Sequence, residues 1–147
     1  MDWYSSESGQ GMTSWYKPTT RYNKASDQIS VEEQVGKNDS LLEHYRALVL
    51  LRNSNSALRS GSFERVVVDD SKIYAYLRAD DKSAFLIALN LADAPSSLAL
   101  DLGNTSLPDG TYNAVDALTK KSFDLNGLTL NLKAEAKASY VLQLIKK

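Results

Sequence analysis

A change in the spacing of apolar residues near residue 61 constrains this sequence more than any other feature. Before it, residues 39–53 repeat apolar side chains at intervals of three or four, which predicts one amphipathic helix. The stripe consists of Leu41, Leu42, Tyr45, Leu48 and Val49. After it, runs such as Leu128, Leu130 and Leu132 alternate with polar residues, as in half-buried antiparallel strands. The chain therefore predicts a helical segment followed by a β-domain.

Residues 61–147 predict a mainly β domain built from seven or eight short strands. The apolar runs lie at 63–68, 73–77, 84–91, 98–102, 112–114, 128–132 and 139–145. Turn residues separate them: Asp69-Asp70, Asp80-Asp81, Pro95, Pro108-Asp109-Gly110 and Asn126-Gly127, the last being the sharpest hairpin signal. Strands at this spacing favour an antiparallel β-sandwich, of the Greek-key type, as the fold class.

The first 38 residues show no sustained period, and a structureless run of that length is uncommon in a compact domain. A capping box at Ser30 and Glu33 predicts a short helix that reaches Gly36, and Ser40 with Glu43 predicts a second box at the start of the longer helix. The helix stripe is wide for its length and requires a large body to pack on. We expect residues 1–38 to be mobile, or ordered only by contacts between copies.

Aromatic side chains are concentrated in this irregular region, where disordered linkers usually have few. Trp3, Tyr4, Trp15 and Tyr16 are the candidate substrate-binding residues, because flat aromatic faces stack on sugar rings. The alternative is that Trp3 and Trp15 fix the loop onto a larger body, and the two roles are compatible.

Composition excludes several function classes. The formal net charge is −1, so no electrostatic case for a nucleic-acid partner exists. No apolar run approaches the roughly 18 residues that a membrane span needs. The sequence has no cysteine, which rules out disulfides, thiol nucleophiles and cysteine-ligated zinc.

A search for catalytic groups assigns none. The first segment holds the carboxylates Asp2, Glu7, Asp27, Glu32, Glu33, Asp39 and Glu43, but none follows an apolar strand as a barrel active site requires. His44, the single histidine, lies inside the predicted helix without metal-ligating partners. The aspartate pairs at 69–70 and 80–81 are read as turns rather than calcium ligands. We therefore predict no catalytic residue, no cofactor and no metal ligand in this chain.

Several segments together carry a resemblance to the α-amylase-type glycoside hydrolases of family 13. Residues 1–4 and 9–16 resemble the loop after the eighth strand of that family's catalytic barrel, and residues 30–34 continue the match. Residues 39–52 and 57–61 resemble the last barrel helix and its exit. The remainder is similar to domain C, the sandwich that follows the barrel.

The resemblance implies that residues 1–60 are a remnant of a (β/α)8 barrel and residues 61–147 are the C-terminal sandwich domain. It implies an α-glucan as substrate of the parent enzyme, with the catalytic carboxylates and any calcium sites upstream, so that this chain is inactive alone. The missing barrel would be its intramolecular partner, and secretion is expected for many such parents. The Trp-Tyr pairs favour the α-amylase branch over the oligo-1,6-glucosidases.

Three functions follow as hypotheses. The first is a structural cap on the barrel of a starch- or maltooligosaccharide-hydrolysing α-amylase. The second is a free-standing carbohydrate-binding module that recognises α-glucans by Trp and Tyr stacking. The third is a generic β-sandwich interaction domain. An uncovered helix stripe also predicts self-association.

Overall fold

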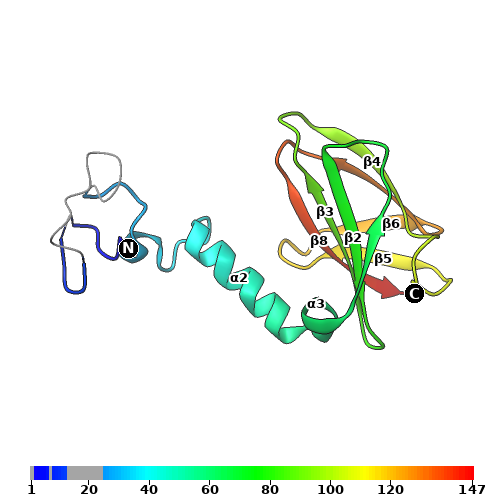
Figure 1. Ribbon diagram of the computed structural model, residues 1–147, viewed down its shortest axis with the longest axis horizontal. Coiled ribbons are helices and arrows are strands. Elements are labelled where there is room, and N and C mark those ends of the chain that lie inside the picture. Colours follow the sequence, from blue (N-terminus) through cyan, green and yellow to red (C-terminus); the bar gives the residue numbers. More distant parts are fainter. Residues whose placement is uncertain (1, 7, 13–24) are drawn as a thin grey trace. The chain divides into compact units, whose positions relative to one another are not determined.

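The computed structural model describes residues 2–6, 8–12 and 25–147 (Figure 1). The chain forms two compact units, Met1–Leu50 and Leu51–Lys147. The sequence boundary at residues 60 and 61 remains a prediction about the natural domain limits.

The short helix of the first unit, α1, spans Val31–Gln34 and begins with the predicted capping box. The Glu33 amide donates to the Ser30 hydroxyl at 3.3 Å, and the Glu33 carboxylate accepts from the Ser30 amide at 3.4 Å. These reciprocal bonds satisfy donors that a helix start leaves free. Gly36 follows with φ +77°, a conformation that favours glycine, and the helix is finished by that residue.

The longer helix, α2, spans Leu41–Ser54, but its predicted capping box forms only in part. The Glu43 amide donates to the Ser40 hydroxyl at 3.2 Å, as expected. The return bond is missing because the Ser40 amide donates to the Lys37 carbonyl at 2.9 Å. The Glu43 carboxylate accepts instead from the Gly36 amide at 2.9 Å. The Ser40 amide and the Glu43 carboxylate, which would complete the capping box, are thus bonded to residues of the turn between α1 and α2.

The second unit contains a short helix and eight strands. Helix α3 spans Ser56–Ser60, a return to helix where the sequence predicted only a stop. The strands are β1 Ser62–Val66, β2 Ile73–Ala79, β3 Ala84–Asn90, β4 Ser96–Asp101, β5 Tyr112–Asp116, β6 Ser122–Asn126, β7 Thr129–Ala134 and β8 Ser139–Lys146. No strand was predicted at β6, since Phe123 and Leu125 are its only apolar residues. The Asn126-Gly127 turn nevertheless required one, and Gly127 adopts φ +61° there.

All pairings are antiparallel, and the strand order is β1-β2-β3-β8-β5-β6-β7-β4. Strands β5, β6 and β7 form a consecutive meander, with β8 beside β5 and β4 beside β7. Each flanking strand completes a Greek key with the meander. The predicted mainly β, antiparallel Greek-key fold is confirmed.

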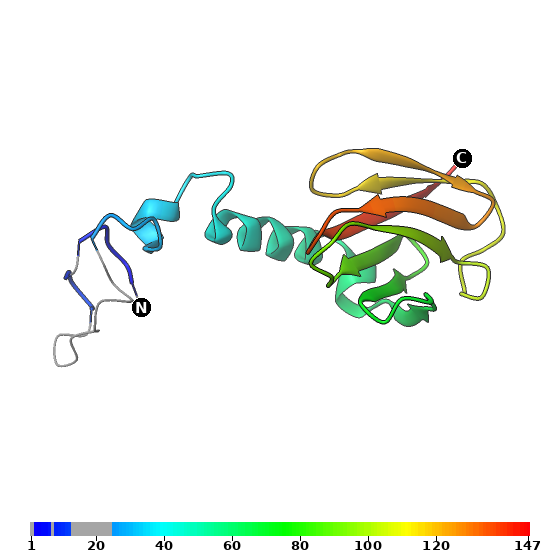
Figure 2. The ribbon, with the colours of Figure 1, turned by 90° about the horizontal axis from the view of Figure 1, so that it is seen from above.

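The sheet folds back on itself, because its connections are too short for a flat sheet. Strands β3 and β4 stand five positions apart, which is about 24 Å in a flat sheet. The link from Asn90 to Ser96 reaches only about 21 Å when fully extended. The later strands therefore lie over the earlier ones as a second layer (Figure 2).

The buried amide of Asn90 ties this turn-back together. Its side-chain NH₂ donates to the carbonyls of Ala94 at 3.0 Å and Glu135 at 2.9 Å, and its oxygen accepts from the Ala92 amide at 3.0 Å. One side chain thus joins the β3–β4 link to the end of β7. Because Asn90 is 1% exposed, the amide end of each of these bonds is buried.

The main core lies between the two layers and draws on every strand. Leu77, Leu86, Leu100, Leu130 and Leu142 are among its fully buried members. A smaller cluster lies on the other side of β3, where Phe85 and Ile87 pack against Ala57 and Leu58 of α3. Strand β3 is therefore covered on both faces, which explains its nearly continuous apolar run.

Candidate functional site

The aromatic segment at the start of the chain is tied to α1 through its backbone. The amide of Val31 donates to the Asp2 carbonyl, and the amide of Glu32 donates to the Trp3 carbonyl, each at 3.0 Å. These two amides lie in the first turn of α1, where backbone N–H groups have no acceptor within the helix. Trp3 is therefore fixed in its backbone while its side chain stays 43% exposed.

Tyr4 is held inside the loop. Its hydroxyl donates to the Gln10 carbonyl at 3.1 Å, and its ring lies against Gly9. A β-carbon added at Gly9 would stand 2.1 Å from a ring carbon of Tyr4, so only glycine fits. Of the four predicted sugar-contacting residues, Trp15 and Tyr16 lie outside the described residues. The structure thus gives Trp3 an open ring and Tyr4 an anchoring role.

Two carboxylates of this segment act as hydrogen-bond acceptors that hold the loop. Glu32 accepts from the Ser5 amide at 2.8 Å and from the Ser5 hydroxyl at 3.0 Å, and these bonds lower its pKa. The Ser30 hydroxyl, at 2.7 Å, lowers the pKa of Glu33. A glycosidase acid needs the opposite shift. Both residues therefore fit the predicted role in the first turn of a helix.

Asp2 behaves differently. Burial raises its pKa, and the negative charges of Asp27 and Glu33 raise it further. Its carboxylate oxygens are buried and have no hydrogen-bond partner in the described part of the chain. Hydrolysis of a glycosidic bond also needs a second carboxylate that faces the substrate. Glu33, whose charge acts on Asp2, is itself engaged in the α1 cap through the Ser30 hydroxyl.

Two hollows lie where α1 meets α2 in the first unit. One, of about 320 Å³, is lined by Gln28, Ile29, Gln34, Lys37, Asp39, Ser40 and Leu41. The other, of about 230 Å³, is lined by Val31, Gln34, Leu41, Leu42 and Tyr45. Tyr45 was assigned only to the helix stripe, and Leu41 with Gln34 lines both hollows. The pattern of aromatic residues did not reveal this surface because most of its lining is polar or aliphatic.

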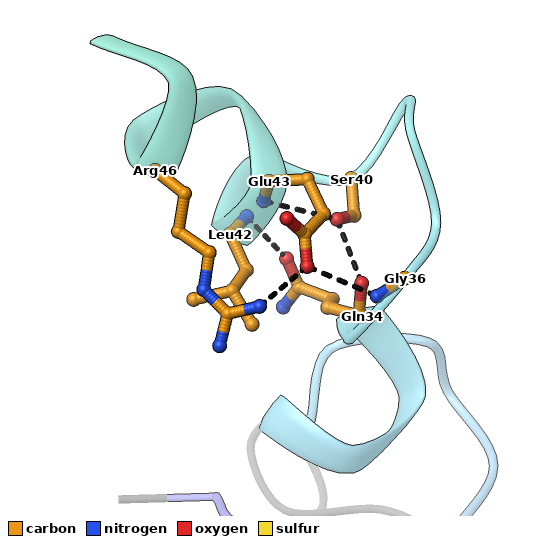
Figure 3. A network of polar contacts seen from close by, with 6 residues as sticks. All are labelled: Gln34, Gly36, Ser40, Leu42, Glu43 and Arg46. Atoms are coloured by element: carbon orange, nitrogen blue, oxygen red, sulfur yellow. Dashed lines mark hydrogen bonds and ion pairs between the residues drawn. The ribbon is translucent and has the colours of Figure 1, made fainter. Parts of the chain in front are cut away.

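A polar network fixes the turn between α1 and α2 (Figure 3). The Gln34 side-chain oxygen accepts from the Leu42 amide at 3.0 Å, and the Gln34 carbonyl accepts from the Ser40 hydroxyl at 2.9 Å. Arg46 pairs with Glu43 at 2.6 Å. The free amides at the start of α2 are thus used by side chains. Free amides at a helix start can bind an anion, and at the start of α2 side-chain oxygens occupy that role.

Further aromatic residues gather on the second unit, on the outer face of β1 and β2. The rings of Phe63 and Tyr76 lie 5.0 Å apart, and those of Tyr74 and Tyr76 lie 5.6 Å apart. The alternation of Tyr74 and Tyr76 predicted a half-buried strand correctly. It could not show that Phe63 would extend the row, since only the β1–β2 register brings Phe63 opposite Arg78.

Other candidate groups serve in turns or lie at the surface. His44 is exposed on α2. Asp70 accepts from the Lys72 amide and Asp80 from the Lys82 amide, each at 2.9 Å, as the turn interpretation requires. Among the described residues, no three His, Cys, Asp or Glu side chains gather as a metal site. Within the same residues, every helix is too short or too polar to cross a bilayer.

Comparison with known proteins places this chain in a family. The family model described as "Maltogenic Amylase, C-terminal domain" matches residues 63–141, which is more than half of the chain. An oligo-1,6-glucosidase of Heyndrickxia coagulans is 29% identical over 100 residues, 68% of this chain and 17% of that protein. A glucan 1,6-alpha-glucosidase of Streptococcus pneumoniae is 31% identical over 101 residues, 69% of this chain and 18% of that protein.

A solved structure supports the same fold. The alpha-amylase of Geobacillus thermoleovorans superposes with a TM-score of 0.63 at 15% identity, over 72% of this chain and 23% of that one. The chain spans less than a fifth of the length of the two curated relatives. The resemblance to α-amylase-type glycoside hydrolases is thereby confirmed, and the chain belongs to the maltogenic amylase C-terminal domain family.

Proposed function

We propose that this chain is the C-terminal part of an α-glucoside-hydrolysing enzyme, in which it caps the catalytic barrel and carries out no catalysis itself. The family match over residues 63–141 is the observation that carries this proposal. The small share of each relative that the chain spans supports it, because the rest of such a protein is long enough to hold a barrel.

The exposed stripe of α2 supports the barrel as intramolecular partner. No residue of α2 is buried, and Leu41, Tyr45 and Val49 are each more than half exposed. Covering one such side chain is worth about 1.5–3 kcal/mol. A barrel that packs on the stripe would recover this free energy. Self-association of the chain through the same stripe is the competing outcome.

The linkage that the parent cleaves is proposed from the sequence relatives. Those reported above are named for action on 1,6-linkages, whereas the alpha-amylase likeness, at 15% identity, concerns the fold. We therefore favour an α-1,6-acting parent. The α-amylase branch, which the Trp-Tyr pairs favour, is the alternative that the activity assays below separate from it.

A sugar-binding role remains the second candidate because the Trp3 ring is exposed. Titration of the 147-residue chain with maltoheptaose and with isomaltotriose, followed by Trp fluorescence and amide shifts, tests this role. A cap domain gives no saturable change at millimolar sugar. Saturable shifts that Trp3→Ala abolishes would favour the binding module.

Activity assays test the proposed parent. The full-length protein should release glucose from isomaltotriose faster than from maltotriose, while the 147-residue chain should hydrolyse neither. Hydrolysis by the chain alone that Asp2→Asn abolishes would overturn the non-catalytic assignment. A full-length protein that cleaves only maltotriose would return the parent to the α-amylase branch.

A further inference from the structure

The sheet of the second unit ends in two edge strands, β1 and β4. In the part of the chain that the structure describes, β4 pairs with β7 alone and β1 with β2 alone. The outer side of an edge strand presents backbone N–H and C=O groups that can bind a further strand, and charged side chains often block such an edge. The two edges are therefore candidate interaction surfaces.

The register of β4 shows which of its backbone groups lie on the open side. The Leu102 amide donates to the Leu128 carbonyl at 3.0 Å and continues the β4–β7 ladder. Residues of an antiparallel pair alternate between hydrogen-bonded and non-bonded positions, so Leu98 and Leu100 also bond to β7. The other residues between Ser96 and Leu102 turn their N–H and C=O groups to the open side: Ser97, Ala99 and Asp101.

The two edges differ in how well their side chains block pairing. Strand β1 carries the exposed, charged Arg65, and its Glu64 accepts from the Ser106 amide at 2.7 Å. On the open side of β4 the three side chains are small and exposed, and the central one is an alanine, Ala99. Strand β4 is therefore the less protected edge.

The open edge of β4 is complementary to itself. When two copies meet antiparallel about a two-fold axis at Ala99, Ser97 of each copy faces Asp101 of the other, and about six backbone hydrogen bonds form. Asp101 accepts from its own Gly103 amide at 2.9 Å through Oδ1, which leaves Oδ2 for the facing Ser97 hydroxyl. An axis at Asp101 would bring two carboxylates together, and an axis at Ser97 would set Pro95, which has no N–H, against Ala99. One register is thus favoured.

Lys133 adds complementary charge to this register. It is exposed and lies beside Ser97 in the β4–β7 pairing. In the paired sheet it stands two strand spacings, about 9.6 Å, from Asp101 of the other copy, with only the small Ser97 between them. Within one copy Asp101 lies four residues further along the strand than Ser97, which is about 13 Å. The opposite charges therefore attract more strongly between copies than within one.

We propose that the β4 edge binds the β4 edge of a second copy of this chain and joins the two second layers into one antiparallel sheet. This inference goes beyond the proposed function, because it requires neither a barrel nor a substrate. The contact is six residues long, so it buries less than the roughly 1,200 Å² of a stable interface. The dimer is therefore weak, with a dissociation constant of about 0.1–1 mM.

Sedimentation equilibrium of the 147-residue chain, from about 10 μM to about 1 mM, tests the dimer. Ala99→Lys sets two lysines face to face on the axis and should raise the dissociation constant about tenfold. Ala47→Lys is the matched control, since Ala47 is exposed and lies on the side of α2 opposite the stripe. It should leave the constant unchanged. If Val49→Lys, on the stripe, dissociated the dimer and Ala99→Lys did not, the stripe would be the interface and the proposal would be overturned.

Amide exchange over the same concentrations gives a readout that is specific for this edge. Exchange at Ser97, Ala99 and Asp101 should slow about twofold or more as the dimer forms, because their amides gain acceptors. Exchange at Leu98 and Leu100 should stay the same, since these amides already bond to β7. A chain that stays monomeric at about 1 mM would overturn the proposal. So would a dimer in which exchange at the three outward amides does not slow.

Discussion

The two units of this chain are stabilised by different forces. Of the residues that the structure describes, every buried hydrophobic one lies in the second unit, from Ala57 onward. Among the described residues of the first unit, Ser30 alone is buried, and it serves as a cap. The first unit thus depends on hydrogen bonds, such as that between the Ser5 amide and Glu32, each worth about 1 kcal/mol net. The second depends on a closed apolar core, so only the second has what an independent fold requires.

The largest effect should come from the core of the second unit. Leu77 is 0% exposed between the layers, and Leu77→Ala should lower the free energy of unfolding by about 2–5 kcal/mol through lost burial and a cavity. Urea denaturation followed by far-UV circular dichroism measures this change. Val67→Ala on the outer face is the control, with an expected loss below about 0.5 kcal/mol. Equal losses for both would contradict a core between the layers.

A smaller loss is expected where the sheet turns back. Asn90→Ala removes the donor to Ala94 and Glu135, and should destabilise the second unit by about 1–3 kcal/mol because the hydrogen bonds of a buried amide are lost. Asn126→Ala, at an exposed turn, is a control without such bonds. The Ala92 amide donates to the Asn90 side chain, so unchanged amide exchange at Ala92 and Ala138 in Asn90→Ala would show that this side chain does not join the β3–β4 link to the end of β7.

In the first unit, loss of a cap should act only locally. Ser30→Ala removes the hydroxyl that caps α1 and should cost that helix about 1 kcal/mol. The readout is amide exchange at Glu33 and Gln34, which should speed up severalfold while the unfolding transition of the second unit stays in place. Ser30→Thr, which keeps the hydroxyl, should restore protection. A shift of the main transition would show that the units are coupled.

The smallest effect concerns pH. The Ser56 hydroxyl, with the amides of Lys82 and Ser83, holds the pKa of Asp80 below its ordinary 3.8. A depressed carboxyl pKa stabilises the fold above the ordinary value, and this contribution disappears as the pH falls through the folded value. Tm should therefore fall below about pH 4. In Asp80→Asn the loss should be shallower, and an identical pH profile would remove Asp80 as a contributor.

Much of the fold could be predicted from local patterns. Tyr74 and Tyr76, or Leu128 to Leu132, alternate because one side of their strand faces the core, and Asn126-Gly127 suits the backbone that a tight hairpin needs. Strand β6 was missed because two apolar residues give too weak a pattern. Helix α3 was missed because five residues carry no period, and its reason to form is the contact of Ala57 and Leu58 with β3.

The candidate site was less predictable. Trp3 and Tyr4 looked equivalent in sequence, yet Gly9 and Gln10 anchor Tyr4 and leave the ring of Trp3 open. The residue type alone does not reveal which aromatic ring packs against its own loop and which is exposed to solvent. The row of rings on β1 and β2 was also hidden, because Phe63 meets Tyr76 only through the register of these strands.

The sequence by itself determined where α1, α2 and most strands form, the capping box of α1, the antiparallel β class and the family resemblance. All of these depend on residues that are near one another in the chain. Only the tertiary structure decided the strand order, the crossing of the chain to the second layer at Asn90, and the placement of Phe63, Tyr74 and Arg78 on one face. These depend on contacts between distant residues, whose loop-closure cost is offset only when the whole core forms, so no short window of sequence encodes them.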